Sequence, residues 1–145
     1  MNEPEVIMKT HRFLKTHTLS NEPVIDLYTD AHSTLLNHPS LKPFQRFTLD
    51  MGDFIAHPDL VGRLGDGESL FAIEAKGESD LIKGLAQAEL YKYGFHYAFF
   101  AASSRALGNS IVDIARRKNI GVISVGKETK LVFSPEAQMP LRNVF

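Results

Sequence analysis

The spacing of apolar residues divides the chain into helical and extended segments. Apolar side chains recur at helical spacing over 4–17 and 23–37, and an Asn-Glu-Pro triplet opens each segment. Asn is a favoured N-cap, and Pro fits the first turn of a helix. Two later segments, 79–93 and 105–119, have the same periodicity, and Ser79 is placed to cap the first of them. We therefore predict four helices.

Runs of apolar, aromatic and β-branched residues between these helices are typical of strands. The predicted strands are 44–54, 54–61, 70–76, 97–102, 120–125 and the edge strand 131–134. Turn residues at 62–67 fold the second and third of these strands into a hairpin, and a loosely docked tail begins at Pro135. An antiparallel start followed by strand–helix–strand crossovers predicts an α/β fold with a mixed central sheet flanked by helices.

Length and composition bound the class of protein. A chain of 145 residues is typical of one domain with one core. The net charge of −1 gives no overall attraction to nucleic acid. The absence of Cys excludes disulfides, thiolate metal sites and cysteine nucleophiles, so any metal must be held by oxygen or imidazole. No apolar run approaches the roughly 20 residues that span a bilayer, and no apolar signal core opens the chain, so we expect a cytoplasmic protein without a membrane partner.

Charged residues interrupt one of the predicted buried strands. Because side chains alternate along a strand, Glu74 and Lys76 point to the same face of 70–76. The hairpin brings Asp59 close to them. Two neighbouring carboxylates repel, and burying them costs free energy unless a cation lies between them. Asp and Glu oxygens are the ligands that Mg²⁺ or Mn²⁺ prefers, and the carbonyl of Ala75 could add another.

Plainer interpretations of the same residues stay open. The two acids could form a structural ion pair with Lys76 or Arg63. His57, beside Pro58, could act as a ligand or a general acid, or it could be an exposed loop residue.

The arrangement Pro58-Asp59, hairpin, Glu74-Ala75-Lys76 resembles the signature of the PD-(D/E)XK nuclease superfamily. The resemblance implies a restriction-endonuclease-like core, with the order α-β-β-β-α-β. We expect this core over about 20–125, with an extra N-terminal helix in 1–20 and the edge strand and tail in 126–145.

The same resemblance implies an activity, a deoxyribonuclease that depends on Mg²⁺ or Mn²⁺ and hydrolyses phosphodiester bonds. Asp59 and Glu74 would bind the metal. Lys76 would orient the attacking water or stabilise charge that develops on the phosphate.

The helix after this strand adds a second motif. Lys83, Gln87 and Tyr91 are spaced four residues apart, so they share one stripe, and Gly84 beside the stripe allows close approach to the sheet. The segment resembles the Gln-X-X-X-Tyr motif of the superfamily branch related to bacterial recombination exonucleases. In that branch the Gln and the Tyr lie near the active site and the DNA backbone, so we expect these three residues to contact substrate.

Many members of this superfamily also carry an acidic residue on the helix before the first core strand, which completes the metal site. Glu22 is the candidate here, because it opens the predicted helix 23–37. Asp26 and Glu5 compete for the same role.

The resemblance makes DNA the expected partner, although the net charge offers little attraction to it. A homodimer or a larger nucleic-acid-processing complex could pool cations from several parts of the surface. The candidate cations are Lys42, Arg46, Lys83, Lys92 and Arg105. The alternatives are an inactive DNA-binding or scaffold module of the same fold, and a nuclease that acts on RNA or on branched DNA such as junctions.

Overall fold

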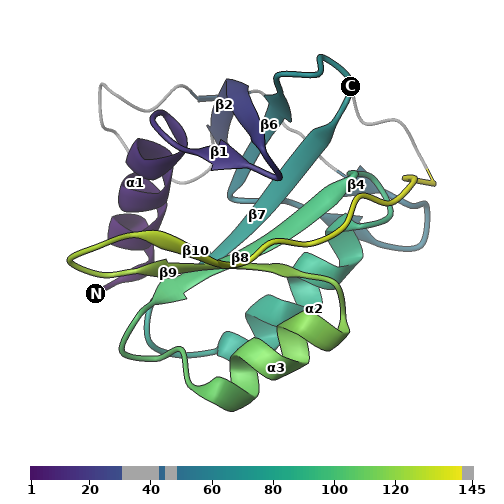
Figure 1. Ribbon diagram of the computed structural model, residues 1–145. Helices are drawn as coiled ribbons and strands as arrows, with labels where there is room; N and C mark the ends of the chain where they lie inside the picture. The colour runs from purple at the N-terminus through teal and green to yellow at the C-terminus, as the bar shows by residue number, and fades with distance from the viewer. Residues whose placement is uncertain (31–42, 45–48, 142–145) are drawn as a thin grey trace.

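A computed structural model of the chain describes residues 1–30, 43–44 and 49–141 (Figure 1). The helices in this part are α1 (Glu3–Leu14), α2 (Leu81–Tyr91) and α3 (Asn109–Arg117). The longer strands are β2 (Glu22–Asp30), β6 (Leu60–Leu64), β7 (Leu70–Lys76), β8 (Tyr97–Ser103), β9 (Gly121–Val125) and β10 (Lys130–Phe133). The two-residue strands are β1 (Thr18–Leu19), β3 (Pro43–Phe44), β4 (Leu49–Asp50) and β5 (Ile55–Ala56).

One mixed sheet forms the centre of the fold. Its strands follow the order β1-β2-β6-β7-β8-β9-β10, with β3 paired to β2, whereas β4 and β5 form a separate pair. Strand β6 is antiparallel to β2 and β7, and β7, β8 and β9 are parallel to one another. Helix α1 covers one face of the sheet, and α2 and α3 lie against the other (Figure 1). The predicted mixed α/β class, with helices on both faces, is confirmed.

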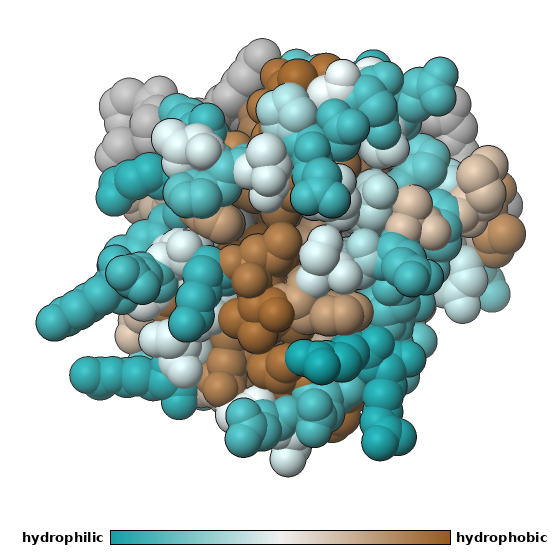
Figure 2. Space-filling model, viewed as in Figure 1, coloured by the Kyte–Doolittle hydropathy of each residue, from teal (hydrophilic) through white to brown (hydrophobic). Residues whose placement is uncertain are grey.

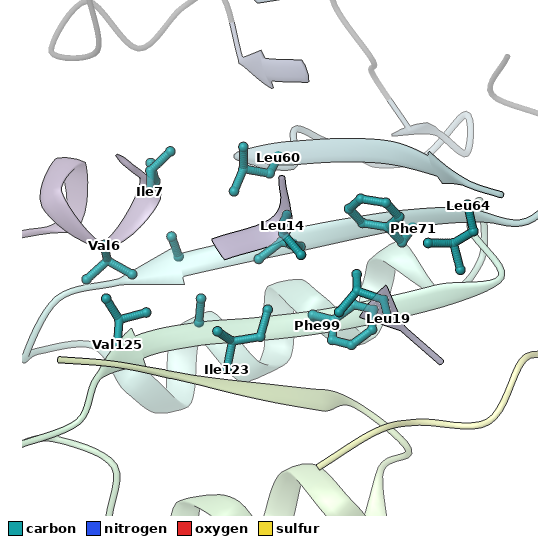
Figure 3. Close-up of a cluster of buried hydrophobic side chains, with 13 residues drawn as sticks. Val6, Ile7, Leu14, Leu19, Leu60, Leu64, Phe71, Phe99, Ile123 and Val125 are labelled. Atoms are coloured by element: carbon teal, nitrogen blue, oxygen red, sulfur yellow. The ribbon is translucent and has the colours of Figure 1, made fainter. Parts of the chain in front are cut away.

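The core on the α1 face explains why the first helix is ordered. Ile7 and Leu14 of α1 pack among Phe71 of β7, Phe99 of β8 and Ile123 of β9 (Figure 3). Each of these side chains is at most 2% exposed. Burial on this scale contributes about 1.5–3 kcal/mol for each large apolar side chain. The first helix is therefore part of the hydrophobic core.

The segment predicted as a helix over 23–37 is instead a strand as far as residue 30, and 31–37 lie outside the described residues. Ser20 and Asn21 have φ values of 49° and 65° and connect β1 to β2 as a tight turn. Two consecutive positive φ values are typical of two-residue hairpin loops. Asn21, the first residue of the second Asn-Glu-Pro triplet, is thus a turn residue. Asn2, in the first triplet, does cap α1, and its side chain accepts a hydrogen bond from the Glu5 amide.

Several predicted boundaries also move. Strand β6 continues to Leu64, so the turn begins at Gly65 and not at residue 62. Helix α2 begins at Leu81 after Asp80, which has a left-handed φ of 59°, so Ser79 is not its cap. Helix α3 begins at Asn109, four residues later than predicted. The predicted strand 44–54 is represented by the short β3 and β4, and residues 45–48 lie outside the described part.

The surface is largely hydrophilic, with an apolar strip across the middle of the face in Figure 2. Large exposed apolar side chains in the described part come from separate elements, among them Ile25 of β2, Ile82 of α2 and Val132 of β10. No helix of the described part is long and apolar enough to cross a membrane.

Truncation of Leu14 tests the place of α1 in the core. We expect Leu14→Ala to lower the free energy of unfolding by about 2–5 kcal/mol, because this side chain is 1% exposed. Arg12→Ala removes an exposed side chain of the same helix and should change that free energy by less than about 0.5 kcal/mol. Chemical denaturation followed by circular dichroism measures both. Equal losses in the two variants would contradict the packing described here.

Candidate metal centre

The β6–β7 hairpin places Asp59 beside the last residues of β7. The two strands pair with Leu60 opposite Ile73, and Asp59 immediately precedes β6. The Asp59 amide donates to the Ile73 carbonyl at 3.0 Å, and the Ala75 amide donates to Asp59 Oδ2 at 2.8 Å. The Asp59 side chain thus accepts the hydrogen bond that follows the last backbone hydrogen bond between the two strands. This bond holds one of its carboxylate oxygens in a fixed position.

These two bonds also orient the carbonyl of Ala75. The amide and carbonyl of one strand residue point to the same side, and this direction repeats every second residue. The Ile73 carbonyl and the Ala75 amide both face Asp59. The Ala75 carbonyl therefore also faces Asp59, as a ligand from this position requires.

Glu74 lies in the interior, 4% exposed, on the face of β7 that packs against α2. The hydroxyl of Tyr91, at the last residue of α2, donates to Glu74 Oε1. The same hydroxyl lies 3.1 Å from the carbonyl oxygen of His57. On its other oxygen, Glu74 Oε2 lies 3.5 Å from Lys76 Nζ. The Glu74 carboxylate is therefore held between a phenol and an ammonium group.

A third carboxylate reaches the cluster from α1. Glu3, Asp59 and Glu74 each offer an oxygen, and these oxygens lie within 4.8 Å of one another. Glu3 is the first residue of α1, and the start of this helix lies against Gly77, directly after β7. A Cβ atom at Gly77 would lie 2.7 Å from the Met1 carbonyl oxygen, so the close approach requires glycine.

Gly84 makes room for Lys76 in a similar way. A Cβ atom at Gly84 would lie 2.7 Å from Lys76 Cγ and 2.6 Å from the Phe100 ring. The methylene stem of Lys76 therefore runs along the first turn of α2, while its ammonium group reaches Glu74. The expectation that Gly84 allows close approach to the sheet is confirmed.

The electrostatics of the cluster favour a cation. Burial, followed by the charge of Glu74, raises the pKa of Asp59 well above its ordinary value, against the hydrogen bond from Ala75. Burial raises the pKa of Glu74 to about 7, against the opposing effects of the Tyr91 hydroxyl and the Lys76 ammonium. When all three carboxylates are ionised, the single ammonium leaves a formal charge of −2. A divalent cation with oxygen ligands would neutralise this charge.

The ion-pair interpretation accounts for only part of this arrangement. Lys76 does pair with Glu74, yet one ammonium cannot balance three converging acids. Arg63 turns away from the cluster to Asp26, with 3.7 Å between Arg63 Nε and Asp26 Oδ2.

The substrate residues expected on α2 divide into two groups. Tyr91 is 1% exposed and belongs to the acid cluster. Gln87 is half-buried, and its Oε1 is a buried acceptor without a hydrogen-bond partner in the described structure. Lys83 is exposed on α2, and within the described residues no ion pair joins it to the acids.

Glu22 does not reach the cluster. It opens β2, not a helix, and its Oε2 lies 3.3 Å from where a Cβ atom of Gly65 would stand, in the turn after β6. That turn is at the opposite end of β6 from Asp59. Asp26 faces Arg63, and Glu5 is an exposed residue of α1. Glu3 provides the helix carboxylate in place of all three.

Sequence reasoning missed Glu3 because it placed the helix acid at Glu22, on the predicted helix 23–37, whose described part is a strand. The available signal was the first Asn-Glu-Pro triplet, which puts an acid in the first turn of a capped helix. His57 contributes its backbone carbonyl to Tyr91, while its side chain is exposed.

A scan against protein-family models, a search of curated proteins and a search of solved structures found no match for this chain.

The raised pKa values predict how stability depends on pH without metal. An unfolded Glu titrates near pH 4.3, whereas Glu74 in the folded protein has a pKa of about 7. Between these values the folded state binds more protons, so its stability falls as the pH rises. Compared with Glu74→Gln, the wild type should lose on the order of 2–3 kcal/mol more between pH 5 and pH 8.

Urea denaturation in EDTA at a series of pH values measures this difference. Burial lowers the pKa of His11 to about 4, which makes stability rise with pH over the acid range. His11 is present in both proteins, so its effect cancels in the comparison. Parallel pH profiles for the wild type and Glu74→Gln would contradict the raised pKa of Glu74.

Proposed function

We propose that this protein is a metal-dependent nuclease that hydrolyses phosphodiester bonds, with DNA as its substrate. One observation carries the proposal, the convergence of the Glu3, Asp59 and Glu74 carboxylates with the Lys76 ammonium at the end of β7. The signature Pro-Asp, hairpin, Glu-X-Lys supplies Asp59, Glu74 and Lys76 in the order that the PD-(D/E)XK superfamily uses.

The ligand set fits Mg²⁺ or Mn²⁺. Glu3, Asp59 and Glu74 would hold the cation, together with the Ala75 carbonyl that faces Asp59. A divalent cation held in this way polarises a phosphoryl oxygen and lowers the pKa of a bound water.

The surrounding residues orient the reacting groups. Lys76 brings one positive charge to the edge of the cluster, where it orients the attacking water or stabilises charge developing on the phosphate. Tyr91 fixes the rotamer of Glu74 through its hydroxyl, so it is a positioning residue. Gln87 lies on the same stripe of α2 as Tyr91, where its amide nitrogen could donate to a phosphate oxygen of the substrate.

The order of the main elements supports a restriction-endonuclease-like core. The chain runs α1, β2, β6, β7, α2, β8, which is helix, three strands, helix, strand. In this assignment α1 is the first core helix, and Glu3 takes the place that was expected for Glu22 in the metal site.

DNA remains the proposed substrate on the strength of the resemblance. Two of the cations considered for a shared DNA surface, Lys42 and Arg46, lie outside the described residues. Lys92 and Lys118 are engaged at the surface, where Lys92 Nζ donates to the Lys118 carbonyl and Lys118 Nζ pairs with Glu89 at 2.9 Å. A homodimer or a larger complex is proposed as the source of further positive charge.

Cleavage of supercoiled plasmid and of linear, single-stranded and branched DNA with Mn²⁺ tests the proposal. We expect wild-type cleavage that EDTA abolishes, and a loss of at least ~100-fold in Asp59→Asn and Glu74→Gln because the cation loses a ligand. Lys76→Ala should lose ~10²–10³-fold in rate while it still binds Mn²⁺.

Asp66→Asn is the control for a carboxylate outside the cluster, since Asp66 accepts hydrogen bonds within the β6–β7 turn. Cleavage that survives in purified Glu74→Gln would reject the assignment. Mn²⁺ binding without cleavage of any substrate would favour the inactive module.

The third carboxylate can be assigned by metal affinity alone. Glu3→Gln should weaken Mn²⁺ binding by ~10-fold or more, because a charged ligand becomes neutral. Glu22→Gln, the matched control on β2, should leave the affinity unchanged. Isothermal titration calorimetry with MnCl₂ measures both, and the opposite ranking would restore Glu22 as the ligand.

A further inference from the structure

A second polar site lies on α1, away from the acid cluster. A cavity of about 280 Å³ opens between the C-terminal half of α1 and the turn that joins β9 to β10. Its polar lining includes Lys9, Arg12, Thr16, His17, Lys127 and Thr129. The volume is close to the lower end of the ~300–1,000 Å³ range of ligand cavities, so it suits a small group better than an extended ligand.

The charge of this cavity is positive. Lys9, Arg12 and Lys127 all line it, and no Asp or Glu of the described chain does. Lys9 Nζ donates to the Gly126 carbonyl at 3.4 Å, which joins α1 to the β9–β10 turn and holds this cation in place. Thr16 and Thr129 add hydroxyls that could donate to an anion. Cations and hydroxyls around a small cavity are a donor set for phosphate oxygens.

The dipole of α1 explains only part of this pattern. A basic residue in the last turn of a helix suits its C-terminal end, which accounts for Arg12. The dipole does not account for Lys127, which lies 115 residues away in sequence, yet faces the same cavity.

The cavity offers charge but little aromatic surface. The Phe13 ring is 8% exposed and lies against the His17 ring, with 4.1 Å between the ring centroids. His17 Nδ1 in turn lies 3.0 Å from the Phe13 carbonyl oxygen, which fixes the imidazole over this end of the helix. A buried, covered ring cannot stack on a nucleic-acid base. The cations and hydroxyls of the lining therefore favour a phosphate group as the ligand.

The position on α1 relates this cavity to the acid cluster. Glu3 and Arg12 belong to the same helix, nine residues apart, which corresponds to about 13–14 Å along its axis. Each strand of a B-form duplex carries one phosphate per ~3.4 Å of helix axis. A nucleic-acid strand held at the acid cluster can therefore span this separation within a few nucleotides.

We infer that this cavity binds a backbone phosphate of the nucleic acid whose phosphodiester is held at the acid cluster, independently of base sequence. The inference rests on the proposed nuclease function. It adds a second anchor on α1, which compensates for the near-neutral net charge of the chain.

Binding of a fluorescein-labelled 20-base-pair DNA duplex in EDTA, followed by fluorescence anisotropy from 20 to 200 mM KCl, tests this inference without cleavage. The slope of log K against log salt should decrease in magnitude by about 1 in Arg12→Ala and in Lys127→Ala, and by about 2 in the double variant. Two duplexes of unrelated sequence should give the same result. Arg117→Ala removes an exposed cation from the last turn of α3, on the other face of the sheet, and should leave the slope unchanged.

The inference is overturned if the wild type does not bind the duplex. It is also overturned if the slopes of Arg12→Ala and Lys127→Ala equal that of the wild type. A further outcome that overturns it is binding of inorganic phosphate at the cavity while both substitutions leave duplex binding unchanged. The site would then bind free anions and not the nucleic-acid backbone. A slope that changes as expected in a protein that cleaves nothing would reject the nuclease function and leave the phosphate site standing. Cleavage with unchanged slopes would reject the phosphate site and leave the nuclease function standing.

Discussion

The electrostatic cost of bringing carboxylates together in a protein interior governs this end of the molecule. Asp59 and Glu74 are drawn to adjacent positions by the β6–β7 hairpin, and Glu3 is added by the start of α1. Burial makes the charged forms of Asp59 and Glu74 unfavourable, as their raised pKa values show. The packing of the fold therefore opposes the mutual repulsion of the acids. A bound cation would attract all three carboxylates and so offset this repulsion.

The packing around β7 holds the three carboxylates close together. Strand β7 lies between β6 and β8, its apolar side chains are fully enclosed on the α1 face, and helix α2 closes the other face. Two glycines set the distances at which the helices approach, Gly77 for the start of α1 and Gly84 for the first turn of α2. The carboxylates thus stand on a frame stabilised by many apolar contacts, so substituting one acid should change the chemistry of the site far more than the fold.

Local patterns predicted the part of the site that lies within one hairpin and one helix. The strand 70–76 was evident from its apolar run around Glu74, and Tyr91 was expected near the site from the resemblance to the Gln-X-X-X-Tyr motif. The parts that depend on distant partners could not be predicted in this way. The same Asn-Glu-Pro triplet caps a helix at Asn2 and turns a hairpin at Asn21, and only pairing with β1 distinguishes the two. Likewise, nothing near Glu3 in sequence indicates that the helix start meets the end of β7.

The cap at Asn2 has a consequence for how the site assembles. Helix ends fray first, and Glu3 lies in the terminal turn that the Asn2 side chain closes through the Glu5 amide. The third carboxylate is thus carried by the least cooperative turn of its helix, while the other two are carried by the sheet. A cation bound at the cluster would hold this turn in place. Hydrogen–deuterium exchange at the amides of the turn would then slow, which reports ion binding even for a metal without a spectroscopic signal.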